Sequence, residues 1–67
     1  MSEMLAYRAY FLTVSDHIRH VIGFKSADDA SAREEAERML EQSEYAAIEI
    51  YEGWRLVFRK ERLQIAA

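Results

Sequence analysis

One amphipathic segment, residues 26–43, organises this chain, because a single helix there separates two stretches that both alternate like strands. Its apolar stripe recurs at helical spacing and consists of Ala32, Ala36, Met39 and Leu40, with Ser43 at its end. Ser26 and Asp29 have the spacing of a capping box, so we expect Ser26 to cap the helix. The two alanines predict close approach to a sheet. Ion pairs are expected on the outer side of the helix between Asp29 and Arg33 and between Glu34 and Arg38.

The stretch before the helix predicts a β-hairpin. Residues 7–14 and 17–25 are rich in aromatic and β-branched residues, and Ser15-Asp16 between them favours a turn. A two-residue loop at that turn pairs Tyr7 with Phe24, Ala9 with Ile22, Phe11 with His20 and Thr13 with Ile18. We prefer this register because it gathers apolar residues on one face, whereas a three-residue loop would scatter them.

The stretch after the helix predicts a second hairpin, formed by residues 45–50 and 54–60. A three-residue loop, Tyr51–Gly53 with Gly53 at positive φ, would also set Glu49 across from Arg55. It would gather on one face Ala46, Ile48, Ile50, Trp54, Leu56 and Phe58. The alternative, a two-residue Glu52-Gly53 loop, would instead place Ile48 and Ile50 on the face of Arg55 and Val57.

These elements predict an α+β fold of ββαββ order, a two-layer sandwich with one helix packed on a four-stranded, mainly antiparallel sheet. Strand order 2-1-3-4 is the simplest that keeps the sheet antiparallel, although the sequence leaves the order open. We expect one domain, residues 1–67, with residues 1–5 and 63–67 frayed. A chain this short buries a small share of its surface and has no cysteine for disulfides, so packing, or packing plus a second copy, must stabilise it.

Charge and composition narrow the setting of the protein. The net charge is −3, with acidic residues concentrated in 28–44 and basic residues in 55–62. This acidity argues against nucleic acid as the main partner, because such binding depends on neutralising phosphates. Residues 4–14 lack the features of a signal peptide, and no apolar run reaches the roughly 20 residues that span a bilayer. With no cysteine, a cytoplasmic protein without a membrane partner is expected.

Residue types that carry chemistry are present but poorly placed for it. His17 and His20 lie three apart on a strand, so they point to opposite faces and cannot share a metal unless a bulge lies between them. We interpret His20 as a partly buried structural residue. The helix carboxylates lie on its solvated outer face. Gly23 and Gly53 are too far apart for a phosphate-binding loop, and Gly23 has no evident role in its strand. We therefore expect no enzyme, no catalytic residue, no metal and no cofactor.

Two surfaces suggest binding. The sheet face opposite the helix is expected to carry more apolar area than a monomer normally exposes. Its candidate interface residues are Tyr10, Leu12, Val21, Tyr45, Tyr51 and Val57. The second surface is the basic last strand, where cations near exposed tyrosines could hold single-stranded nucleic acid. This alternative patch consists of Arg55, Arg59, Lys60 and Arg62.

Several motifs resemble a group of very short, uncharacterised alphaproteobacterial proteins. The resemblance covers residues 7–57 and is carried by Tyr7–Leu12, His17-Ile18, Ala27–Ala30, Ala47–Gly53 and Arg55–Val57. Asp16 stands where that group usually has glycine, and Tyr51 where it often has tryptophan. The resemblance implies a bacterial cytoplasmic protein and supplies no mechanism.

Three functions from different classes follow as hypotheses. The leading one is a non-catalytic protein–protein interaction module that self-associates as a homodimer, or binds another protein, through the open sheet face or a strand edge. The alternative is a nucleic-acid-binding or regulatory accessory protein that uses the basic last strand. The third, a small enzyme subunit, would require a pocket lined by His20 or by carboxylates.

Overall fold

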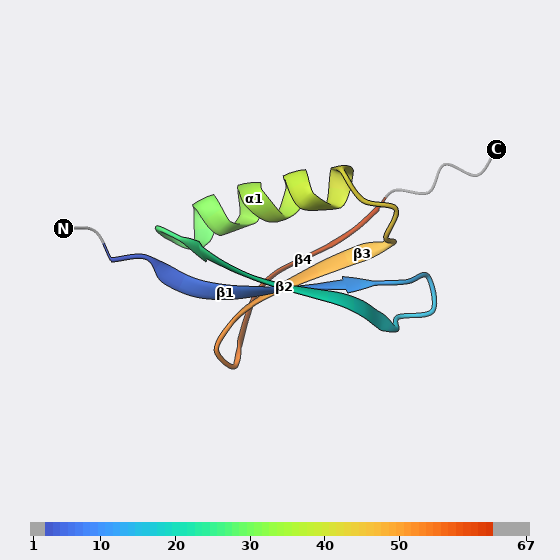
Figure 1. The fold of residues 1–67 in the computed structure, drawn as a ribbon, viewed down its shortest axis with the longest axis horizontal. Helices are drawn as coiled ribbons and strands as arrows, with labels where there is room; N and C mark the ends of the chain where they lie inside the picture. Colours follow the sequence, from blue (N-terminus) through green and yellow to red (C-terminus); the bar gives the residue numbers. More distant parts are fainter. Residues whose placement is uncertain (1–2, 63–67) are drawn as a thin grey trace.

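The computed structural model describes residues 3–62, which form four strands and one helix (Figure 1). The elements are β1 (Leu5–Leu12), β2 (Ile18–Ser26), α1 (Asp29–Glu41), β3 (Ala47–Glu52) and β4 (Arg55–Glu61). All pairs in the sheet are antiparallel, and the strand order is β2-β1-β3-β4. The α+β class, the ββαββ order and the simplest strand order are therefore confirmed.

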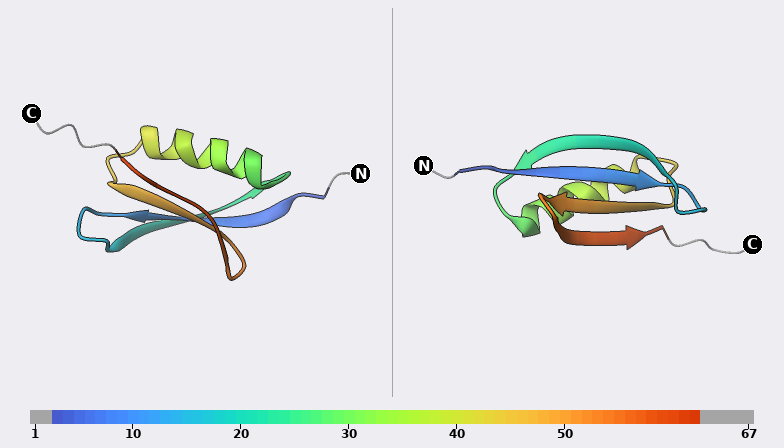
Figure 2. Two further views of the ribbon diagram at one scale, coloured as in Figure 1. Left: turned by 180° about the vertical axis from the view of Figure 1, so that it is seen from behind. Right: turned by 90° about the horizontal axis from the view of Figure 1, so that it is seen from below.

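The helix covers one face of the sheet, and none of the described residues forms a second layer on the other face. Figure 1 shows α1 lying along one side of the four strands, and the right view of Figure 2 shows the uncovered side with α1 behind it. We call this uncovered side the open face. The two hairpins join through the β1–β3 pair, so each hairpin contributes one central strand. The other two strands, β2 and β4, form the edges of the sheet.

One cluster of apolar side chains holds the two layers together. It combines Tyr7, Ala9 and Phe11 of β1, Ile48 and Ile50 of β3, and Ala32, Ala36 and Leu40 of α1. Both alanines are fully buried, so the predicted close approach of helix and sheet is confirmed. Ile48 and Ile50 are also fully buried, and burial of each such side chain contributes about 1.5–3 kcal/mol to stability.

The start of the helix differs from the prediction. Asp28, not Ser26, is the N-cap, and its carboxylate accepts a hydrogen bond of 2.8 Å from the backbone N–H of Ser31. Ser26 instead ends β2 and is buried. The predicted ion pairs on the helix surface are also wrong. Asp29 pairs with Arg55 of β4, and Arg38 pairs with Glu35, three residues away instead of four.

The first hairpin has the predicted pairing over most of its length but reaches it through a different turn. Tyr7 pairs with Phe24, Ala9 with Ile22 and Phe11 with His20. The loop, however, holds the three residues 14–16, because the N–H of Thr13 donates to the carbonyl of His17 at 2.9 Å and Asp16 adopts a φ of 62°.

A bulge on β2 reconciles this longer loop with the predicted faces. Leu12 pairs with Ile18 while Phe11 pairs with His20, so Arg19 is an extra residue on β2. Because the extra loop residue and the bulge compensate each other, Tyr7, Ala9 and Phe11 still pair with Phe24, Ile22 and His20 on the predicted apolar face. The expected two-residue loop and the expected pair of Thr13 with Ile18 are wrong.

The second hairpin departs from the prediction along its whole length. Glu49 pairs with Arg59 instead of Arg55, and Ile50 pairs with Phe58. Glu52 pairs with Arg55, so the loop is the two residues Gly53-Trp54. Gly53 has the expected positive φ, 61°, and glycine at the first central position is typical of a type II′ turn.

A second bulge again explains the difference. The register shifts between Tyr51, which pairs with Leu56, and Ile50, which pairs with Phe58, so Val57 is the extra residue. Strict alternation along β4 is broken at this point. As a result Leu56 lies on the open face while Phe58 packs toward the helix, although the sequence pattern predicted one face for both.

The prediction of frayed ends can be compared with the structure only at the N-terminal end. β1 begins at Leu5, so this residue is part of the sheet. Residues 1–2 and the predicted frayed segment 63–67 lie outside the described residues.

Candidate interaction surface

The open face is formed by alternate residues of the four strands, because successive side chains of a strand point to opposite sides. On β1, Tyr7, Ala9 and Phe11 face the helix, so Arg8 and Tyr10 face away from it. Arg8 lies between Gly23 of β2 and Tyr51 of β3, and Tyr10 lies between Val21 and Glu49. The two central strands thus contribute an arginine and two tyrosines to the middle of this face.

Three of the six candidate interface residues lie accessible on the open face. Tyr10 and Tyr51 meet edge to face with ring centroids 5.4 Å apart, a favourable geometry for aromatic pairs. Both are half-buried, and the Tyr51 hydroxyl donates to Glu49 at 3.4 Å. Val21 on β2 is 48% exposed. These side chains form a partly apolar platform in direct contact with solvent.

Leu12 also occupies an open-face position but is not accessible. It pairs with Ile18 on one side and with Ala47 on the other, and it is only 5% exposed. Leu12 and Ala47 are buried outside the main core cluster. Leu12 therefore stabilises the monomer and is a poor candidate for contact with a partner.

The remaining two candidates lie on the other side of the sheet. Tyr45 precedes β3, and its ring centroid lies 5.2 Å from that of Phe11 in the core. Val57 packs against the same core, because the bulge turns its side chain away from the open face. The expected placement of Tyr45 and Val57 on the open face is wrong.

Sequence reasoning missed the most exposed aromatic residue of the described chain. Trp54 was expected on the apolar face beside Leu56 and Phe58, but it lies at the tip of the β3–β4 hairpin and is fully exposed (101%). Leu56 is 48% exposed on the open face, and Ile18 of β2 is 55% exposed. A type II′ turn has glycine at the first of its two central positions, so Gly53-Trp54 fits the two central positions of such a turn. This signal could have placed Trp54 in the loop.

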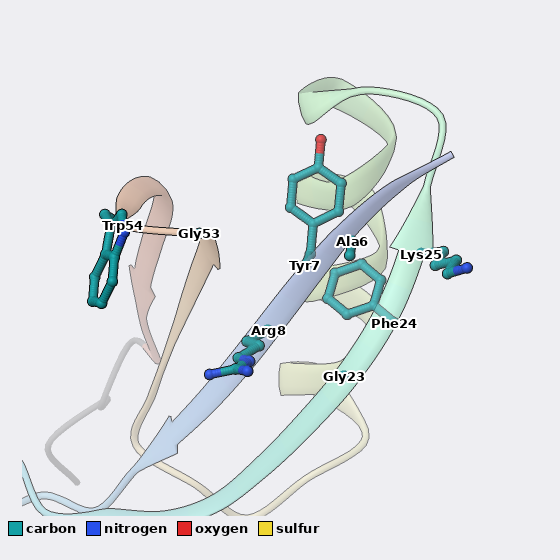
Figure 3. Close-up of a pocket in the computed structure, with 8 residues that line it drawn as sticks. All are labelled: Ala6, Tyr7, Arg8, Gly23, Phe24, Lys25, Gly53 and Trp54. Atoms are coloured by element: carbon teal, nitrogen blue, oxygen red, sulfur yellow. The ribbon is translucent and has the colours of Figure 1, made fainter. Parts of the chain in front are cut away.

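A shallow depression links Trp54 to the first hairpin. Its volume is about 680 Å³, and it is lined by residues of β1, of β2 and of the β3–β4 turn. Figure 3 shows the Arg8 side chain directed toward the side of Trp54, while Tyr7 points to the helix with Phe24 beside it. A second depression, of about 230 Å³, lies on the open face between Tyr10, Tyr51 and Trp54.

The tyrosine in the first depression belongs to a polar cluster that ties three elements together. The hydroxyl of Tyr7 donates to Asp29 at the start of α1 at 2.8 Å. Arg55 donates two hydrogen bonds to the same carboxylate, at 2.9 and 3.1 Å, and one to Glu52 at 2.8 Å. The cluster therefore joins β1, α1 and the β3–β4 hairpin.

The pKa values in this cluster follow from its geometry. Desolvation, then the hydrogen bond to Asp29, raises the pKa of Tyr7 to about 12. The hydrogen bonds from Arg55 and from Tyr7 lower the pKa of Asp29 below its ordinary value. Hydrogen bonding to Asp29 and Glu52 raises the pKa of Arg55. All three shifts favour the protonation states that maintain the cluster at neutral pH.

The four residues of the alternative nucleic-acid patch all have partners within the chain. Besides the pairs of Arg55, Arg59 contacts Glu49, Glu61 at 3.0 Å and Asp16 at 3.4 Å, and Lys60 lies 3.5 Å from Glu37. Hydrogen bonds to Glu61 and Glu49 raise the pKa of Arg59. Acidic neighbours thus compensate most of the charge of this strand.

Arg62 has a different role, at the end of the helix. Its guanidinium donates to the backbone carbonyl of Tyr45 at 2.9 Å and to the carbonyls of Leu40 and Ser43. Carbonyls at a helix C-terminus lack partners within the helix, and a cation there also favours the helix dipole. Arg62 therefore helps to end α1.

The two histidines lie on either side of the bulge at Arg19. His17 lies beside the first turn, and His20 is exposed rather than partly buried, although its ring stacks on Tyr45 at a centroid distance of 6.4 Å. Within residues 3–62, no group of three or more His, Cys, Asp or Glu side chains could hold a metal ion.

In the part of the chain that the structure describes, the helix is neither long nor apolar enough to cross a membrane. Comparison of the chain with protein-family models, with curated proteins and with solved structures finds no match.

Proposed function

We propose that this protein is a non-catalytic protein–protein interaction module that self-associates as a homodimer. The observation that carries the proposal is the incomplete packing of the sheet: within residues 3–62 no second layer covers the open face, and no strand pairs with the outer side of β2, where Ile18 and Val21 are about half exposed. Surfaces of this kind on small soluble domains often mark sites of protein association. A second copy would supply the buried area that so short a chain lacks.

The residue types at the surface also favour a protein partner. Trp, Tyr and Arg are enriched among the residues that dominate binding energies at protein interfaces. Trp54, Tyr51 and Arg8 lie together along the two depressions on this side of the molecule. The strongest pKa shifts arise within ion-paired clusters that join secondary-structure elements, and this favours a structural role for those titratable groups over acid–base catalysis.

The nucleic-acid alternative is the less favoured hypothesis. Binding to phosphates requires cations that neutralise them, and the basic last strand already contacts Glu37, Glu49, Glu52 and Glu61. A cysteine-free composition suits the cytoplasmic setting that we propose for the module.

Sedimentation equilibrium over a range of micromolar concentrations tests the proposed function. We expect the apparent mass to rise from that of a monomer, 7.9 kDa, toward twice that value as concentration increases. A mass that stays monomeric throughout would contradict self-association. Titration with a single-stranded oligonucleotide at two salt concentrations is the matched experiment for the alternative, because phosphate binding weakens steeply with salt.

A further inference from the structure

We propose that a second copy of this chain pairs antiparallel with the free edge of β2, so that two four-stranded sheets join into one sheet of eight strands. This inference rests on the self-association proposed above and names its site. The two-fold axis would pass through Gly23, perpendicular to the sheet. Such an axis keeps both helices on the same side of the joined sheet, and the two open faces become one continuous surface.

The two edges of the sheet differ in how well they are protected. β4 has the bulge at Val57, and four of its seven residues are charged: Arg55, Arg59, Lys60 and Glu61. Bulges and charged side chains are the usual features that prevent edge-to-edge pairing. β4 is therefore a poor template for another strand.

β2 lacks this protection over most of its length. It is nine residues long, and its bulge at Arg19 lies near its start. From His20 to Ser26 the ladder with β1 is regular, and the five residues His20–Phe24 carry no ordinarily charged side chain. No other described strand pairs with its outer side. This regular edge presents unpaired backbone groups that a second strand can satisfy.

Gly23 lies at the centre of this regular stretch, residues 20–26, and the monomer does not explain it. A Cβ placed on Gly23 would meet no atom within 4 Å, and its φ is not in the left-handed region. Glycine weakens a strand interior, and such a residue often marks a place where another backbone approaches closely. A partner strand centred on Gly23 accounts for both its position and its exposure.

The arrangement of side chains selects this register over a neighbouring one. With the axis at Gly23, Ile22 lies opposite Phe24 of the partner copy on the helix side, where both are now only partly buried. On the open face, Val21 lies opposite the partner's Lys25. An axis at Ile22 would instead extend the pairing over the bulge and bring Arg19 near the partner's Lys25, and both a bulge and like charges disfavour pairing of edge strands.

Substitutions at Val21 test this register, with Leu56 as a matched control. Val21 and Leu56 are equally exposed, 48% each, but Leu56 lies on β4. We expect Val21→Lys to weaken dimerisation about tenfold, because it places a lysine opposite the partner's Lys25 twice per dimer. Val21→Glu should strengthen it by pairing with the same lysine, and Leu56→Lys should leave it unchanged. Sedimentation equilibrium measures all three.

Amide hydrogen exchange of the unmodified protein gives an independent readout. On dimerisation, one alternating set of amides in residues 20–26 should exchange about tenfold more slowly, while the β4 amides are unaffected. A dimer in which Leu56→Lys weakens association and the β2 amides show no protection would overturn pairing at this edge but leave self-association intact. A dimer that is insensitive to charge at Val21 overturns the register. A strict monomer overturns both proposals.

Discussion

Asp29 illustrates how much of this fold depends on single polar residues. It follows the N-cap at the start of α1. Its carboxylate accepts one hydrogen bond from the hydroxyl of Tyr7 and two from the guanidinium of Arg55. The sequence predicted Asp29 as the capping-box partner of Ser26 and as the ion-pair partner of Arg33. Spacing along a helix reveals partners on that helix, whereas Arg55 is 26 residues away and comes close only through the tertiary fold.

The raised pKa of Tyr7 leads to a prediction at alkaline pH. Its folded pKa, about 12, lies above the ordinary value of 10.0, so the folded state keeps a proton that the unfolded state releases. The stability that this provides is fully present below pH 10 and should be lost as the pH rises toward 12. In Tyr7→Phe, which keeps the ring beside Phe24, this part of the alkaline loss should be absent.

Urea unfolding from neutral to alkaline pH measures this difference between the two proteins. The lowered pKa of Asp29 acts at the opposite end, where its contribution is lost as the pH falls through its folded pKa. An alkaline stability profile of Tyr7→Phe that parallels that of the parent protein would show that folding does not raise the pKa of Tyr7.

At the scale of elements, the helix was predictable because its periodicity and its packing agree. The stripe of Ala32, Ala36 and Leu40 is buried, as the sequence indicates. The hairpins were harder, because bulges add a residue that no period-two pattern reveals. In the first hairpin the bulge at Arg19 compensates for the wrong loop length, so most of the predicted pairs are correct. In the second hairpin the bulge at Val57 adds to a wrongly placed loop, so the predicted pairs between β3 and β4 are wrong.

Close contact between α1 and the sheet predicts intolerance to larger side chains. Ala36→Leu inserts a side chain where none of the alanine is exposed, and overpacking of this kind destabilises by about 1–3 kcal/mol. Ala30→Leu makes the same change on the exposed side of α1 and should alter stability by no more than about 0.5 kcal/mol.

Urea unfolding at one fixed protein concentration compares the two variants, since association would otherwise change the apparent stability. Equal destabilisation by both substitutions would mean that helix propensity, and not the helix–sheet contact, determines the effect.

At the scale of the whole molecule, the single core lies between the helix and one face of the sheet. The helix side is packed, the open face carries the partly exposed Tyr10 and Tyr51, and Trp54 is fully exposed at the tip of the β3–β4 hairpin. One edge of the sheet, β4, is protected, while the other, β2, is not. Three of the six predicted interface residues lie accessible on the open face: Tyr10, Val21 and Tyr51. The sequence misplaced Tyr45 and Val57, because their faces depend on the path of the α1–β3 connection and on the bulge at Val57. It placed Leu12 on the open face, as observed, but did not reveal that Leu12 is buried there.

Disulfide cross-linking between two single-cysteine chains tests the central claim most directly, because the natural chain has no cysteine. Pairing of β2 with its copy around Gly23 places residue 22 of one chain opposite residue 24 of the other on the helix side. Mixed Ile22→Cys and Phe24→Cys chains should therefore form a covalent heterodimer under mild oxidation, far more than either chain forms alone. Cross-linking of Leu56→Cys with itself, without the mixed product, would contradict the account and place the contact on the open face.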